Sequence, residues 1–254
     1  MDIDFFYTKK LVSNKMSAVF KIFVDFDRTI TKVDVGDSIF SKFADKEQVD
    51  IIIANLLEGK ISAMQSWRSL CDITCNINKD EFDKFIDSID IDQSFRKLVD
   101  YCNSKGIELF ILSDGFDYYI NRILEKESIS CLKLYSNKLT LDASGKLLPE
   151  FPFYDENCTN SANCKRNHII NNSSDEDYTV FIGDGNSDKF TAEYCDFIFA
   201  KDDLLKFCER ERITYFPFGD FNDVVDRIKQ LTLKKRLKKR HQAGLKRRET
   251  YMIE

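Results

Sequence analysis

The stretch FVDFDRTITKVD, residues 23–34, decides the fold. It begins inside an apolar run, residues 19–26, whose continuous hydrophobicity predicts a strand buried on both faces of a sheet. Two carboxylates, Asp25 and Asp27, stand at the end of that run, one residue apart. Residues i and i+2 of a strand point to the same side, and just past the strand end they can diverge. The pattern predicts that both carboxylates serve one ligand there.

Two further apolar runs also end in polar turns, residues 107–115 in SDG and residues 178–188 in GDGNSD. Helical segments alternate with these runs, so we expect a doubly wound, mainly parallel α/β sheet. The carboxyl ends of its strands meet at one edge, where ligands bind in open sheets. That edge should carry Asp25, Asp27, Ser113 and Asp184, with Lys165 added from a neighbouring loop.

The chain between the first two sheet strands is helical in pattern and predicts an inserted cap domain. Apolar spacing predicts one helix over 37–56, followed by helices at about 61–73 and 79–88. We expect four parts: an N-terminal extension (1–17), the α/β core (18–34 and 91–231), the helical cap (35–90) and a basic C-terminal tail (232–254).

The expected edge of the sheet suits phosphate chemistry. Clustered carboxylates repel one another unless a cation lies among them, and hard oxygen ligands select Mg²⁺. A lysine, a hydroxyl and glycine-flanked amides then suit a phosphate group. One carboxylate can attack the phosphorus, and a second can protonate the leaving group and later activate water.

In chain order, the four elements DFDRTIT (25–31), Ser113, Lys165 and GDGNSD (183–188) resemble the motifs of the haloacid dehalogenase superfamily. The helical insertion resembles its phosphoserine-phosphatase-like branch. The resemblance implies a phosphomonoesterase with Asp25 as the nucleophile and Asp27 as the general acid and base. It also implies the remaining ligands: Thr29, Ser113, Gly115 and Lys165 for phosphate, and Asp25, Asp27, Asp184 and Asp188 for Mg²⁺.

Residues 199–231 and the loop ENCTNSANCKRNHI (156–169) are similar to the methionine-salvage family that acts on 2-hydroxy-3-keto-5-methylthiopentenyl-1-phosphate. That family usually has glycine where this chain has Arg28. The candidate contacts to the substrate are Arg28, Asp34, Arg68 and Asn186. Asp34 and Asp37 suit helix caps equally well.

Several alternatives remain open from the sequence. Phosphoserine is one alternative substrate, although Cys71 stands where that branch has a cap arginine. A phospho-acceptor signalling domain would be shorter and would lack the cap, and an ion-pump fragment would need membrane spans. A non-catalytic binding protein on a phosphatase scaffold predicts a lost catalytic residue, and the motifs show none lost.

Composition is that of an ordinary globular protein, with 43% hydrophobic and 32% charged residues. No apolar run reaches the roughly 18 residues of a membrane span, and the first residues do not form a secretory signal. The eight cysteines lack zinc-site spacing, so we expect reduced, buried thiols and a cytoplasmic protein.

Charge is spread unevenly, because residues 234–248 carry nine Lys and Arg and no acid, while the whole chain has a net charge of −5. The segment favours a solvated, frayed helix, with nucleic-acid binding as a minor alternative. The expected partner is a small phosphorylated metabolite, with no membrane involved.

Overall fold

A computed structural model describes residues 19–129, 132–158 and 160–251. The expected N-terminal extension and Cys131 lie outside these ranges. Seven strands form one sheet in the order β4-β3-β2-β1-β5-β6-β7. Their bounds are β1 (Phe20–Asp25), β2 (Glu108–Phe116), β3 (Lys133–Leu141), β4 (Leu147–Glu150), β5 (Tyr178–Gly183), β6 (Phe197–Ala200) and β7 (Phe216–Pro217).

All neighbouring strands are parallel except β3 and β4, which form an antiparallel hairpin. From β1 the chain moves outward to β2 and β3, returns to β5 on the other side of β1, and continues to β6 and β7. The direction of winding therefore reverses at β1, and the carboxyl end of β1 is the place where such sheets bind ligands. The doubly wound sheet is confirmed.

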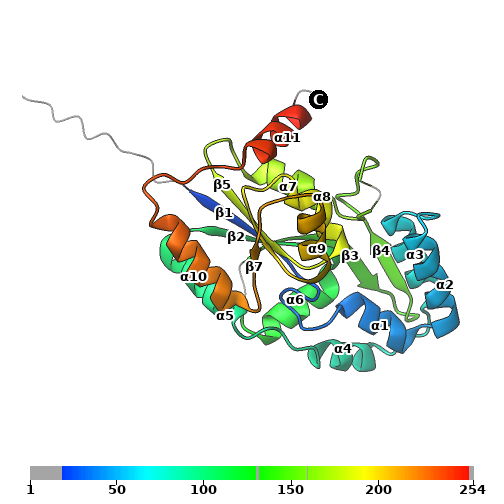
Figure 1. The fold of residues 1–254 in the computed structure, drawn as a ribbon. Coiled ribbons are helices and arrows are strands. Elements are labelled where there is room, and N and C mark those ends of the chain that lie inside the picture. Colours follow the sequence, from blue (N-terminus) through cyan, green and yellow to red (C-terminus); the bar gives the residue numbers. More distant parts are fainter. Residues whose placement is uncertain (1–18, 130–131, 159, 252–254) are drawn as a thin grey trace, which may run out of the picture.

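The central strands are apolar because both of their faces are covered. Ile22 and Val24 point into one core, while Phe23 and Phe181 point into the other. One face is covered by α5 (Phe95–Lys105), α6 (Asp117–Lys126) and α10 (Phe221–Thr232); the other is covered by α7 (Lys165–Asn172), α8 (Lys189–Ala192) and α9 (Asp202–Arg210) (Figure 1).

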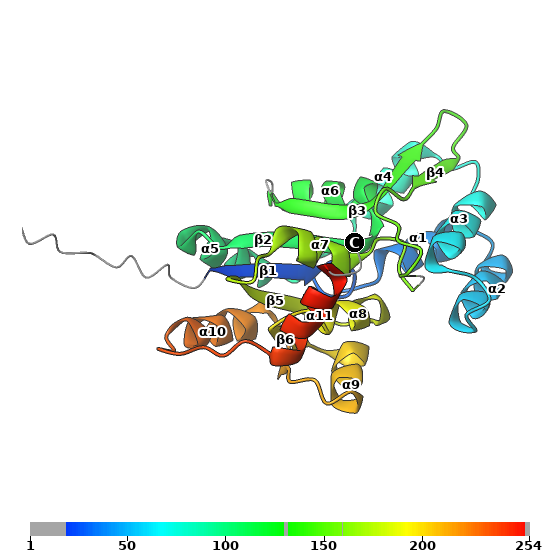
Figure 2. The same cartoon turned by 90° about the horizontal axis from the view of Figure 1, so that it is seen from above.

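Of the five helices between β1 and β2, the first four lie in the stretch where the sequence predicts an inserted cap, and we call these four helices the cap. They are α1 (Val35–Phe43), α2 (Lys46–Leu57), α3 (Ala63–Ile73) and α4 (Lys79–Asp87). The two chain segments that join the cap to the core pair with each other through a bridge between Thr31 and Ile91. Figures 1 and 2 show α1, α2 and α3 beyond the end of the sheet, beside β4.

The single helix expected over 37–56 is wrong, because it is two helices. α1 ends at an extended Ala44, and Asp45 begins α2 by accepting a hydrogen bond from the amide of Gln48 at 3.0 Å. An aspartate that caps the next helix competes with continuation of the first. The break turns α2 toward α3 over the end of the sheet.

The C-terminal segment also differs from the expectation of a solvated, frayed helix. After α10, the chain forms α11 (His241–Tyr251), which packs on the core with Ala243 and Arg247 buried. Arg247 Nη2 lies 3.4 Å from Asp196 Oδ2, and its Nη1 donates to the hydroxyl of Thr179 at 3.1 Å. This docking depends on a buried ion pair that charge counting along the chain does not reveal.

The cysteines behave as small core residues. All seven described ones are free thiols, and of these Cys75 is exposed and the others are buried. Within the described ranges, no helix has both the length and the hydropathy that crossing a bilayer requires.

Candidate active site

Three buried aspartates meet at the carboxyl ends of β1 and β5. Oxygens of Asp25, Asp184 and Asp188 all lie within 4.8 Å of one another. Asp25 is the last residue of β1, Asp184 follows β5, and Asp188 ends the short 3-10 turn η1 (Asn186–Asp188). Buried carboxylates this close repel strongly, so the cluster requires positive charge.

Lys165 supplies part of that charge. Its Nζ lies 2.5 Å from Asp25 Oδ1 and 2.7 Å from Asp188 Oδ1, and it donates to the hydroxyl of Ser187 at 3.1 Å. Burial by itself would lower the pKa of Lys165, but attraction to Asp188 and Asp25 outweighs burial and raises that pKa. The ammonium group therefore stays charged at neutral pH.

Asp184 has an oxygen that suits a further cation. Its Oδ1 accepts from the hydroxyl of Thr29 at 3.2 Å, whereas its buried Oδ2 accepts no hydrogen bond in the described part of the chain. Arg28 Nε lies 3.0 Å from that Oδ2, as an ion pair without hydrogen-bond geometry. Burial and repulsion by Asp25 and Asp188 raise the pKa of Asp184 to about 8. This all-oxygen donor set fits a divalent cation such as Mg²⁺.

Asp27 has different partners and a different protonation preference. Its Oδ1 accepts from the amide of Val35 at 2.9 Å, and its Oδ2 accepts from the hydroxyl of Ser113 at 3.3 Å. Burial, and then repulsion by Asp34 and Asp25, raise the pKa of Asp27 well above its usual value. Asp27 is therefore suited to carry a proton at neutral pH.

The polar turn expected over residues 113–115 is wrong, because these residues belong to β2, which continues to Phe116 with a shift in register against β3. This end of β2 is packed tightly against the site. The amide of Gly115 donates to the Ser113 hydroxyl at 3.0 Å. A Cβ atom on residue 115 would lie 1.7 Å from the hydroxyl of Tyr119 and 3.2 Å from Asp27 Oδ2. Only glycine leaves room for both groups.

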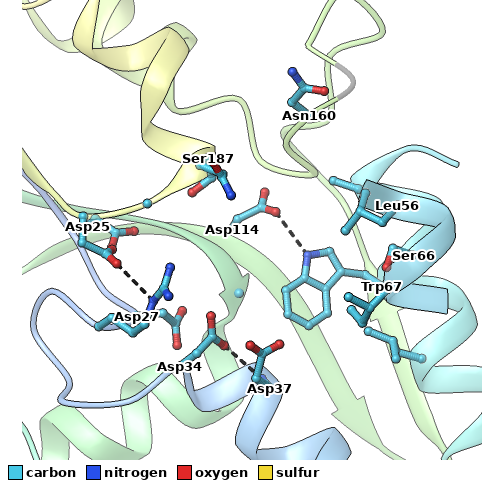
Figure 3. Close-up of a pocket in the computed structure, with 18 residues that line it drawn as sticks. Asp25, Asp27, Asp34, Asp37, Leu56, Ser66, Trp67, Asp114, Asn160 and Ser187 are labelled. Atoms are coloured by element: carbon cyan, nitrogen blue, oxygen red, sulfur yellow. Dashed lines mark hydrogen bonds and ion pairs between the residues drawn. The ribbon is translucent and has the colours of Figure 1, made fainter. Parts of the chain in front are cut away.

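Asp114 joins three parts of the molecule that surround the site. It accepts from the hydroxyl of Ser161 at 2.7 Å and from the amides of Ala162 and Asn163 at 2.6 and 2.8 Å. It also accepts from Trp67 Nε1 of the cap at 3.2 Å (Figure 3). The end of β2 is thereby connected to the loop before Lys165 and to helix α3.

A cavity of about 280 Å³ lies between the core and the cap. Its core side is acidic, and its cap side combines apolar residues with Ser66 and Trp67 (Figure 3). The lining residues are Asp25, Asp27, Arg28, Asp34, Asp37, Ile53, Leu56, Ala63, Ser66, Trp67, Leu70, Asp114, Gly115, Asn160, Asp184, Gly185, Asn186 and Ser187. Such a space suits a small molecule.

The structure brings nearly all predicted site residues together. The cavity wall includes Asp25, Asp27, Arg28, Asp34, Gly115, Asp184 and Asn186, and the layer in contact with it includes Thr29, Ser113, Lys165 and Asp188. Asp34 also caps α1 by accepting from the amide of Asp37 at 2.9 Å. Arg68 does not join the site: it is exposed, and its guanidinium stacks 5.5 Å from the ring of Phe151.

Sequence reasoning does not select Asp37, Ser66, Asn160 or Ser187 as site residues, although all line the cavity. Ser187 stands inside the GDGNSD motif, so its position is a usable signal. Asp114 follows the motif serine directly and differs from the glycine that the family resemblance leads one to expect. The cap residues carry no motif, and only the packing of α3 against the core places them.

Comparisons with known proteins identify the family of this chain. Residues 20–208 match the model of a family described as Putative Phosphatase. The chain belongs to this family. It is accordingly a hydrolase of phosphate monoesters, as its motifs predict.

Two relatives are named 2-hydroxy-3-keto-5-methylthiopentenyl-1-phosphate phosphatase. The protein of Bacillus mycoides (strain KBAB4) is 32% identical over 217 residues, which cover 83% of this chain and 96% of the relative. That of Bacillus cereus (strain ATCC 10987 / NRS 248) is 29% identical over 219 residues, with the same coverage.

Solved structures share the fold. A phosphoserine phosphatase carrying an analogue of its phospho-aspartyl intermediate aligns with a TM-score of 0.63 at 20% identity, covering 83% of this chain and 99% of that one. A substrate-bound phosphoserine phosphatase complex aligns with a TM-score of 0.62 at 21% identity, covering 82% and 98%.

Proposed function

We propose that this phosphatase hydrolyses a small phosphorylated metabolite with the help of Mg²⁺, through an aspartyl-phosphate formed on Asp25. The proposal rests on the different environments of two neighbouring carboxylates. Asp25 is held 2.5 Å from the ammonium of Lys165, while Asp27, one residue further on, is driven toward its protonated form. One group is thus suited to attack phosphorus, and the other to supply a proton.

In the first step, Asp25 attacks the phosphorus atom, and the bond from phosphorus to the ester oxygen breaks. Asp27 gives its proton to the departing alkoxide, which leaves as an alcohol. In the second step, Asp27, now a carboxylate, takes a proton from water as that water attacks the phosphorus. The bond between phosphorus and the carboxylate oxygen of Asp25 breaks, inorganic phosphate leaves, and both aspartates return to their starting state.

Asp25, Asp184 and the backbone carbonyl of Asp27 would hold Mg²⁺, with Asp188 as a further ligand or as a positioning residue. When bound, Mg²⁺ supplies positive charge for the oxygens of the transferring phosphoryl group. Lys165 adds charge from the opposite flank, and Thr29 orients Asp184 through its hydroxyl, 3.2 Å from Oδ1. We assign the hydroxyl of Ser113 and the amide of Gly115 to phosphate oxygens, which would replace the hydrogen bonds that Ser113 donates to Asp27 and Gly115 donates to Ser113.

The cavity chemistry argues against an anionic leaving group. Asp34, Asp37 and Asp114 line the space next to the reacting aspartates, and Arg28, the cation on this wall, is paired with Asp184. A substrate carboxylate such as that of phosphoserine would meet like charge there. An uncharged, hydroxyl-bearing leaving group fits better, and the methionine-salvage substrate named for the relatives is our first candidate.

A second candidate is the phosphate ester of a small amino alcohol. Three carboxylates and the ring of Trp67 share the cavity, and carboxylates with an aromatic face favour an organic cation. The two candidates differ in the charge of the leaving group, so a substrate panel separates them directly.

The test is phosphate release from a panel of phosphomonoesters, with Mg²⁺ or with chelator, by the wild-type protein and by Asp25→Asn. The panel contains the methionine-salvage ester, an amino-alcohol ester, phosphoserine, sugar phosphates and an aryl phosphate. We expect Mg²⁺-dependent release that Asp25→Asn abolishes, with phosphoserine among the poorest substrates. Absence of turnover on every ester would instead support a binding protein on a phosphatase scaffold.

A further inference from the structure

Only some of the cations in the basic C-terminal segment make contacts that stabilise the fold. Lys239 donates to the carbonyl of Asp175, Arg240 to that of Ala192, and Lys246 and Arg247 pair with Glu193 and Asp196. These contacts hold α11 on the core. They leave the positive charges between α10 and α11 unexplained.

Those remaining charges lie close together in the chain, within residues 234–238. Lys234, Lys235, Arg236 and Lys238 are exposed, and their side chains make no hydrogen bond or ion pair with any described residue. Leu233, beside them, is 82% exposed, the largest value among the exposed apolar side chains of the described ranges. We call residues 233–238 the basic ridge.

The basic ridge is held in place at both ends. Leu231 is buried before it, and Leu237 packs against the main core. The carbonyl of Leu237 accepts from the hydroxyl of Tyr178 at 2.8 Å, and the Arg240 guanidinium follows at 2.6 Å from the carbonyl of Ala192. A ligand that meets this segment therefore finds its backbone already ordered, which lowers the entropy cost of binding.

The basic ridge lies away from the catalytic cavity. Tyr178 begins β5, whereas Asp184 follows the other end of that strand. In Figure 1 the chain from α10 to α11 passes the side of the molecule opposite α1, α2 and α3. A surface bound at the ridge would leave the cavity open to solution.

In contrast to the expectation from the sequence that no membrane is involved, we propose that the basic ridge docks this protein onto an anionic phospholipid surface, with the four cations facing the headgroups and Leu233 entering the interface. Charge complementarity selects an anionic partner, because four cations stand here on a chain that is otherwise strongly acidic. The exposed leucine favours lipid, since it gains from apolar contact. Nucleic acid is disfavoured because residues 232–240 contain no aromatic side chain on which a base could stack.

The test is co-sedimentation of the full chain with vesicles of phosphatidylcholine alone, or with about 30% phosphatidylserine, at low and high salt. We expect binding only to the anionic vesicles, and loss of binding at high salt. Each basic residue near such a surface contributes roughly a fivefold factor in affinity, so changing Lys234, Lys235, Arg236 and Lys238 to Gln should weaken partitioning by roughly 600-fold. Leu233→Ser should weaken it severalfold.

A matched control changes four other exposed lysines, Lys32, Lys46, Lys105 and Lys138, to Gln, which alters the net charge equally. This control should still bind, and thermal denaturation should show that all variants fold. The proposal is overturned if the wild-type protein does not bind anionic vesicles, or if both quadruple variants lose vesicle binding equally. It is also overturned if the basic ridge binds a homopolymer RNA and the protein does not sediment with vesicles.

Discussion

At the scale of single residues, the raised pKa of Asp27 leads to a kinetic prediction. Asp27→Asn keeps the shape of the side chain but removes the transferable proton. We expect turnover of an alkyl phosphate to fall by about 100- to 10,000-fold. An aryl phosphate with a good leaving group needs no proton in the first step, so it should still give a rapid burst of phenol followed by slow release of phosphate.

The burst distinguishes a proton donor from a purely structural residue. Rapid-quench kinetics on both esters measures the two steps separately. Loss of the burst along with turnover would show that Asp27 supports the attack by Asp25 itself, and would contradict the assigned role.

The Arg28 side chain lies against Asp184 Oδ2, the oxygen that suits a metal ion. Removal of this side chain should therefore strengthen divalent-cation binding. The backbone of Arg28 has a φ of 57°, which costs a non-glycine residue about 1 kcal/mol. We therefore expect both Arg28→Ala and Arg28→Gly to bind Mg²⁺ more tightly, by severalfold. Both variants lose the ion pair with Asp184, but only glycine relieves the strained backbone, so Arg28→Gly should be more stable than Arg28→Ala by up to about 1 kcal/mol.

Isothermal titration with Mg²⁺ and chemical denaturation with chelator measure these two effects independently. Weaker Mg²⁺ binding in both variants would indicate that Arg28 orders the site instead of competing for Asp184.

The acidic cluster also predicts how stability varies with pH when no metal is bound. Burial and neighbouring charge raise the folded-state pKa of Asp184 to about 8 and that of Asp188 to about 6. The folded chain then holds protons that the unfolded chain, with carboxyl pKa values near about 4, has released. Stability should therefore fall as the pH rises from about 4 toward 8.

Melting temperatures in chelator should drop by a few degrees across this window, and Mg²⁺ should reverse the drop at pH 8 by binding the ionised carboxylates. Asp184→Asn should flatten the profile. An equally steep profile in that variant would assign the pH dependence to other groups.

At the scale of elements, Asp114 and Trp67 connect the cap to the core. Trp67→Phe keeps the aromatic ring and removes the donor that lies 3.2 Å from Asp114 Oδ2. We expect kcat/KM to fall by about two- to tenfold, the value of one hydrogen bond. Asp114 also binds the loop before Lys165. Asp114→Ala should therefore lower kcat/KM by more than Trp67→Phe does, and it should lower kcat as well.

The measurement is steady-state kinetics on the best ester of the panel. Arg68→Ala, one residue further along α3 but outside the cavity, is the control and should leave kcat and KM unchanged. Equal effects of Arg68→Ala and Trp67→Phe would point to general weakening of the cap.

The elements also show how far the sequence could predict this structure. The strands that carry Asp25, Ser113 and Gly183 are predictable because continuous apolar runs are local signals, although β2 continues through the expected polar turn to Phe116. The break between α1 and α2 is harder to see, because Asp45 lies inside a pattern that suits one long helix. The cavity contribution of Trp67 is beyond local reasoning, since it depends on the angle at which α3 meets the core.

At the scale of the whole molecule, the C-terminal helix is the feature that the sequence obscures most. Charge counting predicts a solvated segment, yet Arg247 is 3% exposed and meets Asp196 and Thr179, which lie far away in the chain. Nothing local marks this arginine among eight other cations of the segment. The role of Arg247 depends on its contacts with Asp196 and Thr179. These two residues come together only when β5 and β6 lie side by side.

This buried pair predicts that α11 stabilises the whole fold. Arg247→Ala leaves Asp196 buried without its cation and should reduce the free energy of unfolding by about 3 kcal/mol. Arg248→Ala, on an exposed neighbour, should change it by less than about 0.5 kcal/mol. Urea denaturation measures both. Asp196 accepts hydrogen bonds from Thr179 that do not depend on Arg247. The double variant Arg247→Ala with Asp196→Asn should therefore recover part of the lost free energy of unfolding. No recovery would show that packing of α11, and not the ion pair, stabilises the fold.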